Sequence, residues 1–312
     1  MYLEYYAGID VGGTNLKFGV FSGEGNLIEK WSVPTDFGNG GKNMWQQIHR
    51  EIARHLSVKA LKGIGIGIPG PVLENGYVEV CVNLNLRNFN PVTILRTYFS
   101  DAGDIKIAAA NDANVAALGE QWKGSGQGYR SIGMVTLGTG VGGAVIIDGK
   151  LRYGANGLAG EIGHIRLNPE ETELCTCGGR GCVDQIASAT GIVRYAEKKL
   201  KDNNGNSILR TKGCLTAKTV IDAAKQGDRI AEDIVRYCMK YLAKALAAVV
   251  YVADPEAFII GGGVSEAGDY LIKILQEQFE PYITLSGNRP PILKASLGNL
   301  AGIYGAARLV LN

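Results

Sequence analysis

Short apolar runs that end in glycine mark the first half of the chain and predict buried β-strands joined by tight turns. The first two predicted strands span residues 5–9 and 16–21, and the glycine-containing turn 10–15 joins them. The same order returns later, where the predicted strands 132–137 and 144–147 flank a second glycine run. A unit of strand, glycine turn and strand that occurs twice predicts two related lobes with a cleft between them.

Helical spacing of apolar residues dominates the second half of the chain, whereas the first half mixes single helices with further strands. Two more strands are predicted at residues 64–68 and 105–109, and a strand at 257–260 leads into a third glycine run. The predicted helices are residues 42–56, 186–200, 216–226, 230–252 and 301–310, with two more beginning at Ala113 and Glu266. Alternation of strands and helices indicates an α/β protein.

Length, charge and hydropathy exclude several classes of protein. A chain of 312 residues is long enough for two domains. A net charge of +2 without runs of Lys or Arg argues against a nucleic-acid partner. The longest apolar stretch, residues 245–253, is too short to cross a bilayer, so no membrane partner is expected. The first residues lack a basic region and a secretory apolar run, which predicts a reducing, cytoplasmic location.

One histidine and three cysteines lie close together in the sequence and predict a metal site. These residues are His164, Cys175, Cys177 and Cys182, and glycines interleave the cysteines. Thiolate and imidazole groups are the ligands of tetrahedral structural zinc, and four protein ligands leave no position open for catalysis. The alternatives are a disulfide in an oxidising compartment and cysteines that serve as small buried apolar residues. The clustering among glycines favours structural Zn²⁺.

Two glycine runs match the spacing of a dinucleotide fingerprint but lack its structural context. Residues 138–143 are followed by a predicted strand and residues 65–70 by Pro71, whereas the fingerprint requires a helix directly after the loop. Turns between antiparallel strands present backbone amides that can approach phosphate oxygens. Thr14 and Thr139 add hydroxyls, and Asp10 adds a carboxylate able to hold Mg²⁺. Each turn alone could be a plain hairpin, but together they favour a nucleotide site.

The dipeptide Asn111-Asp112 follows a predicted strand and precedes a predicted helix. An aspartate at such a position can be a helix N-cap without any chemistry. It can also act as a general base that removes a proton from a hydroxyl as that oxygen attacks phosphorus. Both interpretations remain open at this point, and the neighbouring Asn111 could bind the same substrate.

Taken together, these segments resemble the ROK family, named for repressors, open reading frames and kinases. Asp10-Val-Gly-Gly-Thr-Asn-Leu-Lys17 and Leu137-Gly-Thr-Gly-Val-Gly-Gly143 resemble its two phosphate motifs. Gly65-Ile-Gly-Ile-Pro-Gly70 and Gly160-Glu-Ile-Gly-His164 resemble its sugar-side segments, and Asn111-Asp112-Ala-Asn114 the segment of its catalytic aspartate. The run 175–182 is similar to its zinc signature and Gly261-Gly-Gly-Val264 to its adenosine motif.

The resemblance implies a two-lobe, actin-like and hexokinase-like (ribonuclease H-like) ATPase fold with a cleft between the lobes, in a homodimer. We expect a small lobe of residues 1–118, with the last helix, about 301–312, packing back on it, and a larger lobe of residues 119–300 that carries the zinc loop. It also implies ATP-dependent phosphorylation of a hexose, most simply glucose to glucose 6-phosphate, with Asp112 as the base.

The resemblance also assigns the ligands residue by residue. The sugar would contact Gly70, Asn111, Asp112, Glu161, His164 and Asp184. ATP and Mg²⁺ would contact Asp10, Gly12, Gly13, Thr14, Asn15, Lys17, Gly138, Thr139, Gly140, Gly142, Gly262 and Gly263. One ring nitrogen of His164 would bind zinc and leave the other for the sugar, so that the ion sets the tautomer.

Two departures from the family pattern bear on the substrate. Asp184 stands where the family has the longer Glu, which is expected to alter sugar preference, and Ala144 stands where a third glycine is common. N-acetylmannosamine kinase and fructokinase therefore remain alternatives to glucokinase. A non-catalytic, sugar-sensing transcriptional regulator is the alternative of another class. It would need an added DNA-binding helix-turn-helix, and we expect none because the first phosphate strand begins within ten residues of the start.

Overall fold

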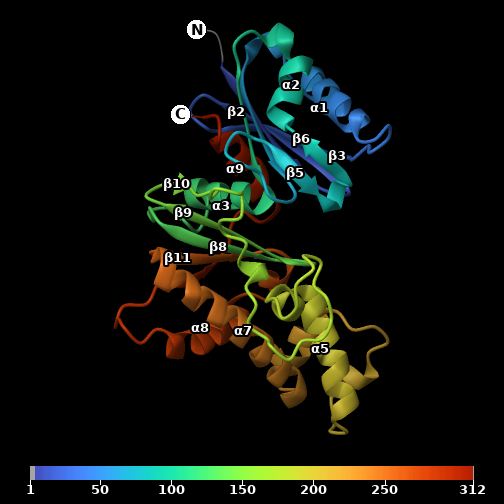
Figure 1. Cartoon of the computed structure of the whole chain (residues 1–312), viewed down its shortest axis with the longest axis vertical. Coiled ribbons are helices and arrows are strands. Elements are labelled where there is room, and N and C mark those ends of the chain that lie inside the picture. Colours follow the sequence, from blue (N-terminus) through green and yellow to red (C-terminus); the bar gives the residue numbers. More distant parts are fainter. Residues whose placement is uncertain (1–3, 312) are drawn as a thin grey trace. The chain divides into compact units, whose positions relative to one another are not determined.

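The chain folds into two compact units, each built around its own mixed β-sheet (Figure 1). The structure is a computed structural model that describes residues 4–311. Unit 1 comprises the described residues up to Gly128, together with Leu151–Ala159 and the described residues from Leu297 onward. Unit 2 comprises Tyr129–Lys150 and Gly160–Ser296. Residue 118, where the sequence analysis ends its first lobe, lies inside a helix of unit 1.

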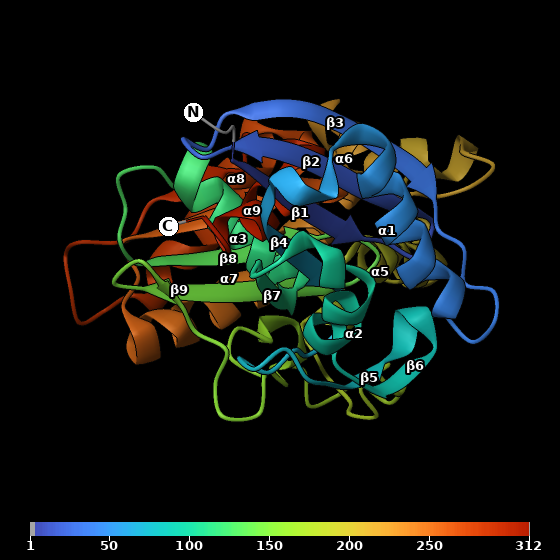
Figure 2. The same cartoon turned by 90° about the horizontal axis from the view of Figure 1, so that it is seen from above.

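The sheet of unit 1 has the strand order β3-β2-β1-β4-β7, and Figure 2 shows the labelled strands in that spatial order. Its first three strands pair antiparallel through two hairpins, and β4 and β7 then add in parallel. The predicted strands are confirmed here, although the structure extends them and adds β3. The strands are β1 (Tyr5–Val11), β2 (Asn15–Ser22), β3 (Leu27–Pro34), β4 (Leu61–Ile68) and β7 (Lys106–Asn111).

Helices and a small two-stranded sheet complete unit 1. α1 and α2 contribute apolar residues to a core that includes Met44, Ile48 and Leu95 beside the central strands. α2 begins with Asn90 as N-cap and Pro91 at its first position, a combination that favours helix initiation. The elements are α1 (Lys42–His55), α2 (Pro91–Tyr98), α3 (Asp112–Lys123), α9 (Ala301–Arg308), β5 (Val78–Cys81) and β6 (Leu86–Phe89).

Helix α9 packs closely on β1, β4 and α3, and its backbone meets theirs directly at glycines. A Cβ atom added at Gly65 on β4 would lie 1.7 Å from the carbonyl oxygen of Ala306. A Cβ atom added at Gly305 would lie 1.5 Å from the carbonyl oxygen of Val115 on α3. Glycine is therefore required at both positions for the helix to lie this close.

The sheet of unit 2 repeats the arrangement of unit 1, with strand order β10-β9-β8-β11-β12. β8 and β9 form an antiparallel hairpin, and β11 and β12 add in parallel. The predicted duplication is thus present as two sheets of matching strand order. The strands are β8 (Ile132–Leu137), β9 (Val141–Ile147), β10 (Lys150–Leu151), β11 (Ala257–Gly261) and β12 (Ile292–Lys294).

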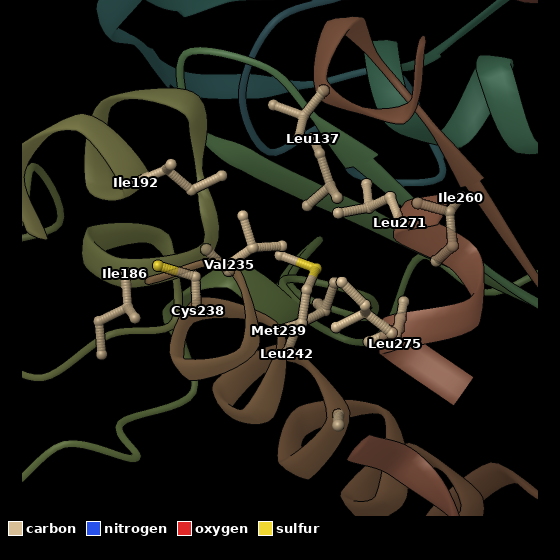
Figure 3. Packing of buried hydrophobic residues seen from close by; sticks show 14 of the residues in the cluster. Leu137, Ile186, Ile192, Val235, Cys238, Met239, Leu242, Ile260, Leu271 and Leu275 are labelled. Carbon is tan, nitrogen blue, oxygen red and sulfur yellow. The ribbon is translucent and has the colours of Figure 1, made fainter. Parts of the chain in front are cut away.

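The long helix α7 (Arg229–Ala253) forms the centre of the unit 2 core. Asp228 caps its first turn by accepting a hydrogen bond from the Ala231 amide, and the left-handed residue Asp254 ends it before Pro255. In Figure 3 Val235, Met239 and Leu242 of this helix lie in one cluster with Leu271 and Leu275. The other helices are α4 (Asp184–Ala187), α5 (Ala189–Asp202), α6 (Ala217–Lys225) and α8 (Asp269–Phe279).

Three predicted segments differ in detail from the structure. The helix predicted to begin at Glu266 begins instead at Asp269, because Gly263–Ala267 form a 3-10 turn that ends at Gly268 with positive φ. The predicted helix 186–200 is divided into α4 and α5 because Ser188 adopts an extended backbone and caps α5 through the Gly191 amide. The second glycine run is shorter than predicted, since β9 already begins at Val141 and leaves a turn of residues 138–140. None of the helices within residues 4–311 combines the length and apolar character that a membrane span requires.

A substitution at Gly305 tests the close packing of α9. In an exposed helix, glycine to alanine adds about 1 kcal/mol of stability. Here we expect Gly305→Ala to lower the free energy of unfolding by about 1–3 kcal/mol or more, because the new Cβ overlaps Val115. Denaturant unfolding followed by circular dichroism measures the change. Gly23→Ala, whose Cβ meets no atom within 4 Å, is the control. A gain in stability for Gly305→Ala would contradict this packing.

Candidate functional site

The first glycine turn of unit 1 joins β1 to β2 and leaves Gly13, Thr14 and Asn15 exposed. The amide of Gly12 donates to the Asn15 carbonyl at 2.9 Å and closes the turn. Thr35 braces the turn from the far end of β3, donating its hydroxyl to the Gly12 carbonyl at 2.8 Å and its amide to the Thr14 carbonyl at 2.9 Å. The turn is therefore rigid and open to solvent, as an anion-binding turn must be.

Asp10 and Lys17 face each other across the β1–β2 hairpin below this turn. Their side chains form an ion pair with a distance of 3.2 Å between Nζ and Oδ2. A Cβ atom at Gly302, in the first turn of α9, would lie 2.7 Å from the Asp10 carboxyl carbon. The Asp10 carboxylate therefore lies between helix α9 on one side and Lys17 on the other.

Asn111, and not Asp112, is the N-cap of α3. The N-cap of α3 is Asn111, whose Oδ1 accepts from the amides of Ala113 and Asn114 at 2.8 and 3.2 Å. Its Nδ2 donates to the Gly70 carbonyl at 3.0 Å. The N-cap interpretation of Asp112 is therefore wrong, because the preceding residue already fills that position.

Asp112 is the first residue of α3 and is exposed to solvent. Its Oδ1 accepts from the Ala113 amide at 2.8 Å, which orients the carboxylate at the start of the helix. Cys81 is buried close by, where burial, and to a lesser degree the charge of Asp112, raises the pKa of the thiol to about 11. An oriented, solvent-accessible carboxylate is thus present at this strand end, and a carboxylate in such a position is chemically able to accept a proton.

In unit 2 the turn 138–140 lies against the glycine segment that follows β11. A Cβ atom at Gly262 would lie 2.5 Å from the carbonyl oxygen of Leu137, so only glycine allows the contact. Ser265 fixes that segment by donating its hydroxyl to the Gly262 carbonyl at 2.7 Å. Gly263 is exposed, and a Cβ there would meet no atom within 4 Å. Two glycine loops thus meet where β8 and β11 end.

The segment of Glu161 and His164 packs on β9 through glycines. A Cβ atom at Gly163 would lie 2.1 Å from the Val141 carbonyl oxygen, and one at Gly143 2.3 Å from that of Gly160. Glu161 and His164 are partly buried, and 3.9 Å separates the Oε2 and Nε2 atoms. Burial raises the pKa of Glu161, and His164 partly opposes this. A carboxylate and an imidazole thus lie side by side, both able to hydrogen-bond hydroxyls.

The four predicted metal ligands converge in the structure. The ligand atoms of His164, Cys175, Cys177 and Cys182 all lie within 4.8 Å of one another. The Sγ atom of Cys175 is 3.8 Å from Nδ1 of His164, and the Sγ atoms of Cys177 and Cys182 are 3.6 Å apart. These separations suit a tetrahedral ion with ligand bonds of about 2.0–2.3 Å and exceed the roughly 2.05 Å of a disulfide. The donor set therefore fits zinc.

The proton equilibria of the cluster also favour a cation. Burial and the neighbouring Cys177 and Cys175 raise the pKa of Cys182 to about 12. Burial acts the same way on Cys177, but the Gly179 amide, the other two cysteines and Arg166 together lower the pKa of its thiol. Three ionised thiols cannot share this space without a positive ion, and a divalent cation would remove the conflict.

Two residues that no sequence motif identified, Gln185 and Arg194, hold the loop of Cys175, Cys177 and Cys182 in place. Gln185 accepts from the amides of Gly181 and Cys182 at 2.9 and 3.2 Å. Arg194 on α5 forms ion pairs with Glu171 and Glu173, which precede the cysteines. The contacts of Gln185 are local, whereas Arg194 lies 21 and 23 residues after its two partners, so the fold alone brings these ion pairs together.

Comparisons with known proteins identify the family of this chain. The family model for the ROK family matches residues 6–312, and the chain belongs to the ROK family. Glucokinase of Halalkalibacterium halodurans is 38% identical over 98% of this chain and 95% of its own length. N-acetyl-D-glucosamine kinase of Haemophilus influenzae is 31% identical over 98% of this chain and 99% of its own length.

A solved structure extends the likeness to the fold. The ROK family glucokinase from Streptomyces griseus, determined in complex with glucose and AMPPNP, has a TM-score of 0.79 and is 33% identical. The alignment covers 98% of this chain and 99% of that one. The expected hexokinase-like α/β fold is therefore confirmed.

Proposed function

We propose that this protein is an ATP-dependent sugar kinase that converts a hexose, glucose in the first instance, to its 6-phosphate. The observation that carries the proposal is the likeness along almost the whole chain to glucokinases, one of them solved with glucose and an ATP analogue. The exposed Asp112 and the rigid glycine turns supply the groups that phosphoryl transfer requires.

In unit 1, we assign the phosphate and magnesium roles to the β1–β2 hairpin. Asp10 would hold Mg²⁺ directly or through water, and Lys17 would pair with phosphate oxygens. The turn residues Gly12, Gly13, Thr14 and Asn15 would surround the phosphates. Asp112 would accept the proton of the attacking sugar hydroxyl.

The hydrogen bonds that Asn111 already makes limit which of its side-chain groups could bind a sugar. The Asn111 side-chain oxygen already accepts two amides, and its nitrogen already donates once, to Gly70. An amide nitrogen carries two hydrogens, so a second donor remains for a sugar hydroxyl. We therefore propose Asn111 as a donor to the sugar and Gly70 as the residue that orients it.

In unit 2, we assign Gly138, Thr139, Gly140 and Gly142 to the phosphates and Gly262 and Gly263 to the adenosine. Glu161 and Nε2 of His164 would bind sugar hydroxyls. Nδ1 of His164 faces Cys175 and would bind zinc, so that the ion fixes the ring for the sugar. Zinc held by His164, Cys175, Cys177 and Cys182 has no open position and would be structural.

Several hexoses besides glucose are candidate substrates. The N-acetyl-D-glucosamine kinase relative makes an N-acetylated hexosamine, including N-acetylmannosamine, the second candidate, and fructose the third. A non-catalytic sugar-sensing regulator is the alternative outside the enzymes. We also propose a homodimer, which sedimentation equilibrium can test.

A coupled ADP-release assay tests the function. Glucose, mannose, fructose, N-acetylmannosamine and N-acetylglucosamine are compared at equal concentration with Mg·ATP. We expect the highest kcat/KM for glucose. A higher value for an N-acetylated sugar would change the substrate but keep the kinase. Sugar binding by calorimetry without ADP release from any of them would favour the regulator.

Asp112→Asn tests the base. We expect kcat to fall by about 10²–10⁴-fold, because the amide cannot take the hydroxyl proton. The affinity for glucose, measured by calorimetry, should change little. Asp104→Asn is the matched control, since Asp104 is exposed just before the other end of the same strand. A variant at position 112 that turns over at near the parental rate would remove Asp112 from the reaction.

Cys177→Ser tests the metal. We expect the purified protein to contain one Zn²⁺ per chain by elemental analysis, and the variant to contain much less. The midpoint of thermal unfolding should fall with the zinc, because four-ligand zinc sites contribute directly to folding stability. Cys214→Ser is the control, since Cys214 is an exposed free cysteine outside the cluster. An active parental protein with reduced thiols and no metal would contradict the assignment.

A further inference from the structure

Asp184 forms a contact that its position in the sequence does not predict. It is the first residue of α4, two residues after the metal ligand Cys182. Its Oδ1 accepts a hydrogen bond from the backbone amide of Val141 at 2.6 Å. Val141 is the first residue of β9, directly after the turn 138–140. The carboxylate is thus bonded to the backbone of the proposed phosphate turn.

The turn itself is shaped to admit this carboxylate. A Cβ atom at Gly140 would lie 2.7 Å from Oδ1 of Asp184, closer than real Cβ atoms approach an oxygen. Any side chain at position 140 would therefore displace the carboxylate. Asp184 and Gly140 form a matched pair in which the missing side chain of one leaves room for the other.

Two further hydrogen bonds reach the turn from the same stretch of chain. The Ala189 amide donates to the Gly138 carbonyl at 2.8 Å. The Thr190 hydroxyl donates to the Thr139 carbonyl, also at 2.8 Å. The fully buried Ser188, whose hydroxyl lies 3.0 Å from that of Thr190, anchors this stretch. The segment 184–190 therefore holds the turn and its exit by hydrogen bonds to Gly138, Thr139 and Val141.

The direction of these bonds decides where the free amides point. In a trans peptide the carbonyl oxygen and the amide hydrogen point in opposite directions. Because the segment 184–190 holds the carbonyls of Gly138 and Thr139, the amides of Thr139 and Gly140 point away from it. Within residues 4–311 neither amide donates to a protein acceptor. Two adjacent amides are thus aimed together at the open side of the turn, as in an anion-binding nest.

We propose that Asp184 is a positioning residue for the phosphate turn: it acts through Val141 and Gly140 on nucleotide binding, and its contact with the sugar is not its principal role. This inference rests on the proposed kinase function, and it revises the sugar-contact role that the resemblance implies for this position. The shorter aspartate side chain suits the backbone contact, since Oδ1 already reaches the Val141 amide.

Calorimetry with separate ligands tests the proposal. Mg²⁺·AMPPNP without sugar and glucose without nucleotide are titrated into the parental protein and Asp184→Ala. A hydrogen bond to a charged group contributes enough that its loss should weaken Mg²⁺·AMPPNP by about tenfold or more. Glucose affinity should stay within about twofold. Asp184→Asn keeps an acceptor oxygen of the same reach, so it should recover most of the nucleotide affinity.

A second variant addresses the same turn without touching the carboxylate. Thr190→Val removes the hydrogen bond to the Thr139 carbonyl and should weaken Mg²⁺·AMPPNP in the same direction, with glucose again unchanged. Asp202→Ala, at the exposed far end of α5, is the control and should alter neither titration. Zinc content and the thermal midpoint are measured for each variant, so that general unfolding is recognised by loss of both ligands.

The outcomes separate this inference from the proposed function. If Asp184→Ala loses glucose affinity and keeps that for Mg²⁺·AMPPNP, Asp184 is a sugar ligand and the positioning role is overturned while the kinase stands. The positioning role is also overturned if Asp184→Ala and Thr190→Val both bind Mg²⁺·AMPPNP as tightly as the parental protein does. If the parental protein binds neither ligand, the proposed function falls and this inference falls with it. A KM increase for Mg·ATP with little change in the KM for glucose would support the positioning role.

Discussion

Direct packing of backbone against backbone at glycines is the constraint on which both units depend. In unit 1, α9 approaches the carbonyl of Val115 through Gly305, and β4 meets that helix through Gly65. In unit 2, the segment that carries Glu161 and His164 meets β9 through Gly143 and Gly163. A methyl group at any of these points would separate the elements, so the side chains carried by them would lose their positions.

Hydrogen bonds from outside each turn then make the glycine segments rigid. Glycine loses more conformational freedom on folding than any other residue, so a free glycine turn would be a poor binding surface. Thr35 holds the first turn, and the segment 184–190 holds the second. Each support bonds two carbonyls of its turn, and in the second turn Asp184 also bonds the Val141 amide. Prior ordering of this kind lowers the entropy cost of binding a ligand.

The cluster of His164, Cys175, Cys177 and Cys182 is connected through the chain to the segment that supports the second turn. Cys182 and Asp184 are separated by one residue, so the loop that the four ligands define leads directly into the segment that supports the second turn. His164, the fourth residue of the cluster, comes from an earlier segment of the chain and lies beside Glu161. An ion bound there would connect the imidazole that faces the proposed sugar with the carboxylate behind the proposed phosphate turn. A structural metal can in this way influence two ligands that it does not touch.

The sequence alone predicted most of the strands and helices, the duplication and the family, because apolar period and motif spacing are local properties of the chain. It also predicted the cluster of His164, Cys175, Cys177 and Cys182, whose ligand atoms converge in the structure. It left Asp112 between an N-cap and a base, and the structure excludes the N-cap because Asn111 occupies that position. It also marked Asp184 by its departure from the family pattern but could not show its partner. Only the tertiary structure brings Asp184 to Val141, or Arg194 to Glu171, since neither pair is near in sequence. Such contacts depend on how helices and strands pack, and packing is decided by the whole core rather than by any one segment.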